Sequence, residues 1–246
     1  EYKARVVSES RVNNAINKFK ENRSLLREIA EQFQVQPRFI VALWGIESDF
    51  GRIDGGFPVI AALATLAYDG RRANYFRNEL LEALRIINDG QAVPEEMIGS
   101  WAGAMGQLQF MPSTVRRFWF DYNKNSRLDL WKTPVEALAS AANYLSKLGW
   151  RGDETWGREV KLPPGFKAEL AQLSIQKPLS EWQKLGIRSV DGQDLPDPNL
   201  DASLVIAEDG GPAFLVYRNY RILLNWNRST FFAVSVGYLA DRLNGL

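Results

Sequence analysis

Glu47 is the residue whose type and position most clearly suggest chemistry, because it falls among apolar side chains in an expected helix. Pro37 is a favoured first helical position and Gly51 is a favoured residue just past a helix end, so the sequence predicts a helix between them. On a helical wheel at about 100° per residue, the apolar stripe consists of Phe39, Leu43, Ile46 and Phe50. Glu47 falls inside this arc, whereas Ser48 and Asp49 fall on the polar side.

A carboxylate that faces inward must be paired, have a raised pKa, or both. Glu47 also belongs to the last turn of the expected helix, where the helix dipole disfavours negative charge. Both effects favour a protonated carboxyl near neutral pH, which is the state that a general acid needs. The alternative is a structural glutamate that pairs with an arginine or extends to solvent.

Composition excludes most other catalytic groups. The chain of 246 residues contains 0 His and 0 Cys, which removes Ser-His-Asp and Cys-His catalysis, disulfides and most zinc chemistry. If the chain is an enzyme, carboxylates, hydroxyls, amides, lysine or arginine must carry the reaction. A net charge of +1 without a basic tract gives no support for a nucleic-acid partner.

A second distinctive segment covers residues 99–113 and is rich in glycine, methionine and glutamine. Its glycines permit close backbone approach. Ser100, Gln107 and Gln109 supply neutral hydrogen-bonding groups suited to sugar hydroxyls and N-acetyl groups. The alternative is a structural turn that packs Met105 and Phe110 into the core, and we expect both interpretations to hold.

The elements that must position these groups are mostly helices. Apolar periodicity predicts a helix pair over 8–34, a short helix from Pro112, and helices over 59–68, 74–88, 134–148, 220–225 and 229–243. Between 157 and 216 the periodicity weakens, and alternating residues predict a small β unit with a hairpin formed by 203–207 and 213–216. The longest apolar stretch, 59–68, is too short for a transmembrane segment.

Two motifs resemble one known family. Residues 44–51 resemble the catalytic segment of the B-type lytic murein transglycosylases, and residues 99–113 resemble that family's second signature, in the same order and at about the same spacing. The resemblance implies a mainly α (α+β) fold in which a lysozyme-like catalytic core carries an additional helical domain and a small inserted β domain. The implied core comprises 37–58, 99–156 and 217–246, the helical domain 1–36 and 59–98, and the β domain 157–216.

The resemblance also implies a reaction, which is cleavage of the MurNAc–GlcNAc β-1,4 bond of peptidoglycan without water or a catalytic cofactor. Glu47 would be the sole catalytic carboxyl. It would protonate the glycosidic oxygen and then, as carboxylate, take a proton from the C6 hydroxyl of MurNAc, which closes a 1,6-anhydro ring. An ordinary glycosidase needs two carboxylates, but a nucleophile within the substrate has a high effective concentration.

Further residues match substrate-contacting positions of the family. By resemblance, Ser100, Met105 and Gln109 would line the groove close to the catalytic carboxyl. Arg71 and Arg72 could hold peptide-stem or lactyl carboxylates bidentately. The alternative for the arginines is solvated surface charge.

Four more positions match the family's groove, namely Tyr144, Trp226, Asn227 and Phe232. Their aromatic faces could stack on sugar rings. Trp226 and Phe232 stand where the family often has tyrosine, so the resemblance does not carry a phenolic hydrogen bond to them. The alternative is ordinary core packing.

The stretch from Asp121 to Asp129 resembles an EF-hand loop, with oxygen side chains at positions one, three, five and nine. The ligands of a structural Ca²⁺ ion would be Asp121, Asn123, Asn125, the carbonyl of Arg127, and Glu136, which would close the site. Ser126 stands where glycine is usual and Lys132 where a bidentate glutamate is usual. Because two asparagines lower the ligand charge, binding should be weak. The alternative is an Asx-rich turn without metal.

Three functional hypotheses remain. The first is a periplasmic lytic transglycosylase that acts on peptidoglycan glycan strands. The second is a lysozyme-like muramidase that gives reducing ends, for which Asp49 and Asp54 are nearby carboxylates. The third is a non-catalytic peptidoglycan-binding scaffold, which would not need a costly buried acid.

The resemblance further implies a periplasmic protein that is soluble or lipid-anchored to the outer membrane through a segment absent from this chain. Other cell-wall enzymes are expected as partners. The chain begins at Glu1 rather than Met, which indicates a mature or trimmed form.

Overall fold

The structure is a computed structural model that describes residues 7–196, 199–208 and 210–246. Contacts divide the chain into two compact units. The helical unit comprises Ser10–Leu148 and Leu243–Leu246. The mixed unit comprises Gly149–Arg242 with the described residues before Ser10. Within the part of the chain that the structure describes, no helix has the length and apolar character needed to cross a membrane.

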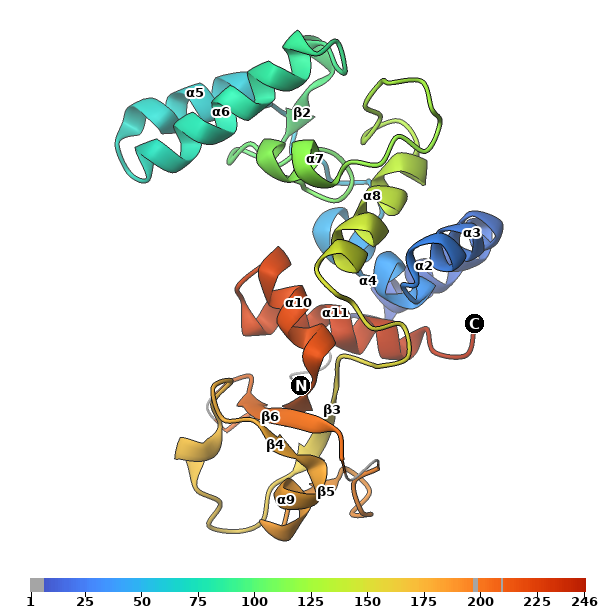
Figure 1. Cartoon of the computed structure of the whole chain (residues 1–246), viewed down its shortest axis with the longest axis vertical. Helices are drawn as coiled ribbons and strands as arrows, with labels where there is room; N and C mark the ends of the chain where they lie inside the picture. The colour runs from blue at the N-terminus through green and yellow to red at the C-terminus, as the bar shows by residue number, and fades with distance from the viewer. Residues whose placement is uncertain (1–6, 197–198, 209) are drawn as a thin grey trace. The chain divides into compact units, whose positions relative to one another are not determined.

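The helical unit is a set of helices with one short β pair (Figure 1). Its elements are α2 (Glu9–Glu21), α3 (Arg23–Phe33), α4 (Pro37–Ser48), β1 (Phe57–Pro58), α5 (Val59–Asp69), α6 (Ala73–Asn88), the 3-10 turn η1 (Pro94–Glu96), β2 (Ile98–Gly99), α7 (Pro112–Phe118) and α8 (Pro134–Lys147).

Helix α4 is the central helix of this unit. Residues 39–45 are all buried, and α4 packs on α3 and α8. The helices around it bury one face each, as Leu26, Ile29 and Phe33 of α3 do at helical spacing. A helix that is apolar on most sides belongs in a core, so α4 provides a rigid support for Glu47 near its end.

Helices α5 and α6 pack side by side as an arm of the helical unit (Figure 1). The arm is joined to the segment that follows it by backbone pairing. Phe57 pairs with Gly99 in the antiparallel β1–β2 ladder, and the N–H of Val59 donates to the carbonyl of Met97 at 2.9 Å. These backbone hydrogen bonds therefore fix the start of the arm to the beginning of residues 99–113.

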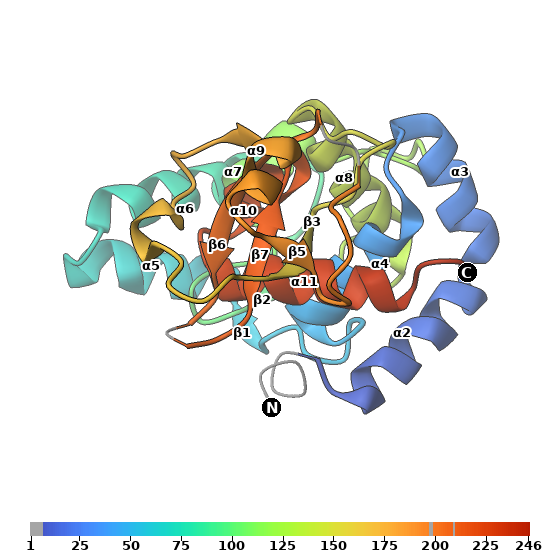
Figure 2. The ribbon, with the colours of Figure 1, turned by 90° about the horizontal axis from the view of Figure 1, so that it is seen from below.

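The mixed unit contains a five-stranded sheet with strand order β4-β6-β7-β3-β5, and every pair in it is antiparallel (Figure 2). Its elements are β3 (Gly157–Lys161), the 3-10 turn η2 (Ala168–Leu170), β4 (Lys177–Pro178), α9 (Leu179–Lys184), β5 (Arg188–Ser189), β6 (Asp201–Ile206), β7 (Ala213–Val216), α10 (Arg218–Trp226) and α11 (Thr230–Arg242).

Successive side chains along these strands are buried on opposite faces of the sheet. Leu204 and Leu215 belong to a core cluster with Trp182 of α9, whose indole N–H donates to the carbonyl of Ala202 at 3.0 Å. On the opposite face, the ring centre of Phe214 lies 5.6 Å from that of Trp156. Both faces are therefore covered, which explains why the period-two signal in the sequence is weak.

The expected helices and the hairpin of 203–207 with 213–216 are present, the latter as β6 and β7. Asp209, in the expected turn, lies outside the described residues, as do 1–6 of the expected helical domain. Helix α9 and the two-residue strands were not expected. The contacts place 149–156 and 217–242 with the sheet, whereas the sequence assigned them to the catalytic core; that assignment stays a prediction.

Candidate functional site

Glu47 lies in the last turn of α4 and is partly exposed. The helix ends at Ser48, earlier than the expected end at Gly51. Asp49, Phe50 and Gly51 follow with φ of 50°, 62° and 81°, so the chain leaves the helix through three left-handed residues. The carboxyl is therefore carried by a buried helix yet remains reachable from solvent.

The expectation that Ser48 and Asp49 face a polar surface is wrong, because both are buried. The Ser48 hydroxyl donates to the carbonyl of Gln107 at 2.5 Å and accepts the N–H of Gly51 at 2.8 Å. Asp49 forms ion pairs with Arg52 and, at 4.0 Å, with Arg11. The left-handed turn folds the chain back over the end of α4 and covers these polar groups.

Gln107 forms several hydrogen bonds that hold the turn after α4 in place. Its side-chain Oε1 accepts the indole N–H of Trp44 at 3.0 Å, and its Nε2 donates to the carbonyl of Trp131 at 2.9 Å. Its backbone N–H donates to Leu130 at 2.9 Å. Gln107 is buried and thus holds α4 to residues 99–113 and 130–131, rather than presenting its amide to a sugar as the sequence suggested.

Met105 is 0% exposed, and its assignment to substrate contact stays a prediction. Its backbone bridges Gly99 on one side and Phe110 on the other, and its side chain therefore packs in the core. Phe110 is buried as well. Core packing, the alternative interpretation of this segment, holds for these two residues.

Ser100 and Gln109 are partly exposed and keep hydrogen-bonding capacity. The Ser100 hydroxyl oxygen accepts the N–H of Ala104 at 3.1 Å, which leaves its own proton to donate. The Gln109 amide nitrogen donates to the carbonyls of Asp54 at 3.3 Å and Gly106 at 3.0 Å. Its carbonyl oxygen is therefore the atom that it can offer to a ligand.

Arg71 and Arg72 are exposed where α5 turns into α6. The guanidinium carbon of Arg72 lies 4.4 Å from the centre of the Tyr75 ring and 5.6 Å from that of Phe76. Within the described residues neither arginine forms an ion pair with a carboxylate. The two cations are thus available to an anionic ligand.

Glu79 of α6 is a buried carboxylate that the sequence did not single out. It is 4% exposed, and it accepts the N–H of Ser113 at 2.9 Å and the Ser113 hydroxyl at 2.7 Å. Ser113 lies in the first turn of α7, at the end of residues 99–113. Helical spacing could not predict Ser113 as the partner of Glu79, because the two residues belong to different helices, α6 and α7.

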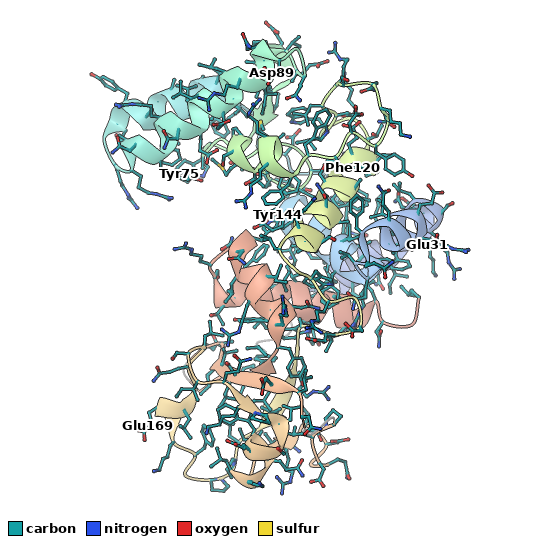
Figure 3. All side chains as sticks on the ribbon, viewed as in Figure 1. Glu31, Tyr75, Asp89, Phe120, Tyr144 and Glu169 are labelled. Atoms are coloured by element: carbon teal, nitrogen blue, oxygen red, sulfur yellow. The ribbon has the colours of Figure 1, made fainter. Side chains whose placement is uncertain are left out.

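Tyr144 of α8 is nearly buried and lies at the packing of α7 on α8, as labelled in Figure 3. Its ring centre is 4.7 Å from that of Phe118, nearly edge-on, and 6.5 Å from that of Phe110. Burial raises the pKa of Tyr144 to about 12, partly offset by the charge of Arg117. The phenol is therefore neutral at physiological pH.

Trp226, Asn227 and Phe232 belong to the mixed unit. Trp226 ends α10 and is partly exposed, Asn227 is exposed, and Phe232 is buried in α11. Their assignment to the same groove as Glu47 stays a prediction.

The Asp121 loop is organised by its own hydrogen bonds. Asp121 accepts the N–H groups of Asn125 and Ser126 at 3.1 and 2.8 Å, and Asn125 accepts the N–H of Arg127 at 2.8 Å. The buried Glu136 accepts donors from Trp119, Asn123 and Asp129 at 3.0–3.1 Å. Among the described residues, no three acidic side chains form a group that could hold a metal ion.

Lys132, at the loop position where a ligand carboxylate is usual, donates to Glu96 at 2.9 Å. The Lys132 ammonium lowers the pKa of Glu96. The loop thus offers oxygen ligands of the type that Ca²⁺ prefers, but they are engaged with N–H donors and one candidate position carries a positive charge.

Comparisons with known proteins agree with this geometry. The family model described as transglycosylase SLT domain matches residues 1–241. The membrane-bound lytic murein transglycosylase B of Escherichia coli (strain K12) is 30% identical over 253 residues, which cover 98% of this chain and 66% of the relative. The chain thus spans less than two thirds of the length of that relative.

Solved structures extend the comparison. SltB3 from Pseudomonas aeruginosa in complex with NAG-anhNAM-pentapeptide superposes with a TM-score of 0.94 at 42% identity, covering 99% of this chain and 66% of that one. Escherichia coli Slt35 in complex with calcium gives a TM-score of 0.84 at 29% identity, covering 98% of this chain and 77% of that one. These neighbours confirm the mainly α, lysozyme-like fold class with a small sheet. The chain belongs to the family of the transglycosylase SLT domain.

Proposed function

We propose that this chain is a lytic transglycosylase that cleaves the β-1,4 bond between MurNAc and GlcNAc of peptidoglycan without water and leaves 1,6-anhydroMurNAc ends. The observation that carries the proposal is the family match over residues 1–241, joined to a neighbour that binds NAG-anhNAM-pentapeptide. The partly exposed carboxyl at the end of a buried helix supplies the acid that such a reaction needs.

In the proposed reaction, Glu47 acts first as acid and then as base. Its carboxyl proton passes to the glycosidic oxygen as the bond from that oxygen to C1 of MurNAc breaks. The resulting carboxylate takes the proton of the C6 hydroxyl while the C6 oxygen bonds to C1, which restores the protonated acid. The ring closure is intramolecular, so one carboxyl suffices.

Ser100 and Gln109 are proposed to bind the N-acetyl groups of the substrate. An acetamido group has one N–H donor and one carbonyl acceptor. Ser100 can donate its hydroxyl proton, and Gln109 can accept with its carbonyl oxygen, because their other atoms are engaged within the protein. Neutral groups of this kind orient a sugar without adding charge beside the acid.

The remaining predicted contacts form part of the same proposal. Arg71 and Arg72 would bind carboxylates of the peptide stem or lactyl group, since both are exposed cations. Tyr144 would border the groove from α8, and the substrate contacts of Trp226, Asn227 and Phe232 stay predictions. The division into core, helical and β domains stated above belongs to this proposal too.

The runner-up is a muramidase that uses water and a second carboxylate. Asp49 is poorly suited to activate water, because Arg52 and Arg11 hold it in ion pairs. Asp54 is the better candidate, since its backbone carbonyl binds Gln109 and places it beside the second signature. A hydrolase would yield reducing ends.

One digest separates these functions. Purified peptidoglycan is incubated with the protein, and the soluble muropeptides are analysed by mass spectrometry. Anhydro ends, lighter than reducing ends by one water, are expected. Reducing ends alone, with loss of turnover in Asp54→Asn, would establish the hydrolase instead, and binding without soluble product would identify a scaffold.

Glu47→Gln tests the catalytic residue. The amide cannot donate an acidic proton, so turnover should fall by at least about 100-fold, while the melting temperature stays close to that of the wild type. Glu169→Gln, at an exposed carboxylate of the mixed unit (Figure 3), is the matched control and should keep full turnover. Full activity of Glu47→Gln would refute the assignment.

A weak structural Ca²⁺ site at the Asp121 loop is proposed as well. Its ligands would be Asp121, Asn123, Asn125, the carbonyl of Arg127, and Glu136. Escherichia coli Slt35 has been solved in complex with calcium, and the oxygen donors of this loop suit a hard cation. Their present hydrogen bonds and the nearby Lys132 argue for low affinity.

Thermal unfolding with calcium chloride or a chelator tests this site. An ion that binds only the folded state raises the melting temperature as its concentration exceeds Kd. The rise should be seen with millimolar calcium chloride, exceed that with magnesium chloride, and vanish in Asp121→Asn. An identical melting temperature in chelator and calcium would remove the site.

The proposed substrate places the site of action in the cell envelope, where the periplasm is the proposed compartment. Glycan strands are the proposed macromolecular partner. Association with other cell-wall enzymes stays a prediction.

A further inference from the structure

The arm of α5 and α6 contains an arginine, Arg72, whose side chain lies over aromatic rings and, within the described residues, pairs with no carboxylate. Arg72 has φ of 58° at the start of α6, and its guanidinium lies over Tyr75 at 4.4 Å and Phe76 at 5.6 Å. Contact with a ring face uses none of the N–H donors of a guanidinium. The rings therefore hold the side chain while its donors remain available to a ligand.

The two rings differ in exposure, since Phe76 is buried and Tyr75 is exposed. Phe76 is buried and meets Tyr75 nearly edge-on, with ring centres 5.1 Å apart. One helical turn after Tyr75, Glu79 is tied to Ser113 by two hydrogen bonds. Burial and the nearby charge of Glu79 raise the pKa of Tyr75, so its ring stays neutral.

These contacts form a chain from the second signature to an exposed cation. Ser113 is the last residue of the signature, and Glu79 binds it from α6. Tyr75 lies one helical turn before Glu79 and carries Arg72 on its ring; Figure 3 labels Tyr75 on the arm. Arg71 provides a contrast within the same turn, because no ring among the described residues lies under it. Of the two arginines, Arg72 is the one whose guanidinium lies over described rings.

We propose that Tyr75 is a positioning residue that holds Arg72 edge-outward toward a carboxylate of the substrate, and thereby favours peptide-bearing over bare glycan strands. The inference rests on the proposed function. A stem peptide ends in a carboxylate, and bidentate arginine is the group best matched to it. An arginine that is already ordered loses less side-chain entropy when it binds.

The test compares kinetics on peptide-bearing glycan strands with kinetics on strands from which an amidase has removed the stems. Tyr75→Leu removes the π face and should raise KM on peptide-bearing strands about 2- to 5-fold, with kcat unchanged and no change on bare strands. Tyr75→Phe keeps the ring and should restore the wild-type KM. An unchanged KM in Tyr75→Leu, or equal changes on both substrates, would overturn the proposal.

A double-mutant cycle separates positioning from general damage to the arm. In an Arg72→Ala background, Tyr75→Leu should have no further effect on KM, whereas in an Arg71→Ala background it should keep its full effect. Additive effects of Tyr75→Leu and Arg72→Ala would contradict the inference. Failure of the proposed function is seen separately, as absence of anhydro products from the wild-type protein.

Discussion

At the residue scale, the turn that follows Glu47 depends on a glycine packed against a glutamine. A Cβ at Gly51 would lie 2.7 Å from Oε1 of Gln107, and φ there is +81°. Gln107 cannot move aside cheaply, because both ends of its amide are bonded, to Trp44 and to Trp131. The close contact between the two residues thus sets the path of the chain out of α4.

Gly51→Ala should destabilise the protein more than a glycine substitution of the same backbone type. Gly56 is the matched control, with φ of +71° and no atom within 4 Å of an added Cβ. Gly56→Ala carries only the left-handed strain of about 1–2 kcal/mol, whereas Gly51→Ala should cost about 1–3 kcal/mol more from overpacking. Urea unfolding measures the free energy of unfolding of both variants. Equal decreases would show that the Gln107 side chain moves aside from the added Cβ without cost.

The sequence could place Glu47 near the end of a helix but could not predict the residues that support it. A helical wheel gives the direction of each side chain but not where the chain goes after the last turn. Ser48 looked polar-facing for that reason, although a partner 59 positions away accepts its hydroxyl. The sequence alone suggests that Gln107 binds sugar, because it shows that the side chain is an amide but not which groups the amide contacts.

At the element scale, the packing of α7 on α8 places a phenol where it resists ionisation. Tyr144 has a pKa near 12 instead of 10.0 because of burial against the rings of Phe118 and Phe110. Between these pH values the unfolded chain loses the Tyr144 proton and the folded one keeps it. Stability is thus full below pH 10 and should fall with rising pH, by about 1.4 kcal/mol per unit.

Tyr144→Phe tests this slope. The variant keeps the ring packing but has no phenol to ionise, so its free energy of unfolding should fall less steeply with alkaline pH. Other tyrosines with raised pKa values, such as Tyr220, contribute equally to both proteins and cancel in the difference. Parallel urea-unfolding curves for the two proteins from pH 10 to 11.5 would disprove burial as the cause.

Elements with strong periodicity could be predicted, and those made by distant pairing could not. The helices α3, α4 and α8 follow from apolar spacing and from Pro37 and Pro134 at first helical positions. Strands β1 and β2 have two residues each, and only their pairing across 40 positions defines them. Helix α9 is short, so its apolar spacing was lost among the neighbouring prolines and glycines.

At the scale of the whole molecule, the residues after Gly149 are tied to the sheet through a few long-range bonds. The indole N–H of Trp156 donates to Asp241 of α11 at 3.0 Å. Asn219 of α10 accepts the N–H of Arg151 at 2.9 Å and donates to its carbonyl at 2.8 Å. Weak helical periodicity and alternating residues predict the β region from 157. The hydrogen bonds of α10 and α11 to the residues before β3 cannot be predicted in this way, because their partners are distant in the sequence.

The absence of histidine gives the whole molecule a simple response to pH. Apart from the α-amino group, no residue type in the chain ordinarily titrates between pH 6 and 7.5, since the sequence has 0 His and 0 Cys. Apart from Glu47 and the α-amino group, the folded and unfolded states should therefore bind nearly equal numbers of protons in this range, so Glu47→Gln should have an almost constant melting temperature.

Activity should vary over the same range, because the proposed general acid must start protonated. As Glu47 ionises in the free enzyme with rising pH, kcat/KM should fall. A Glu47 carboxyl that keeps its proton to higher pH in the folded state than in the unfolded state also makes the wild-type melting temperature fall over the same range. Glu47→Gln should lack both this fall and pH-dependent turnover. A melting temperature of Glu47→Gln that falls as steeply as that of the wild type would show that a group other than Glu47 causes the decline.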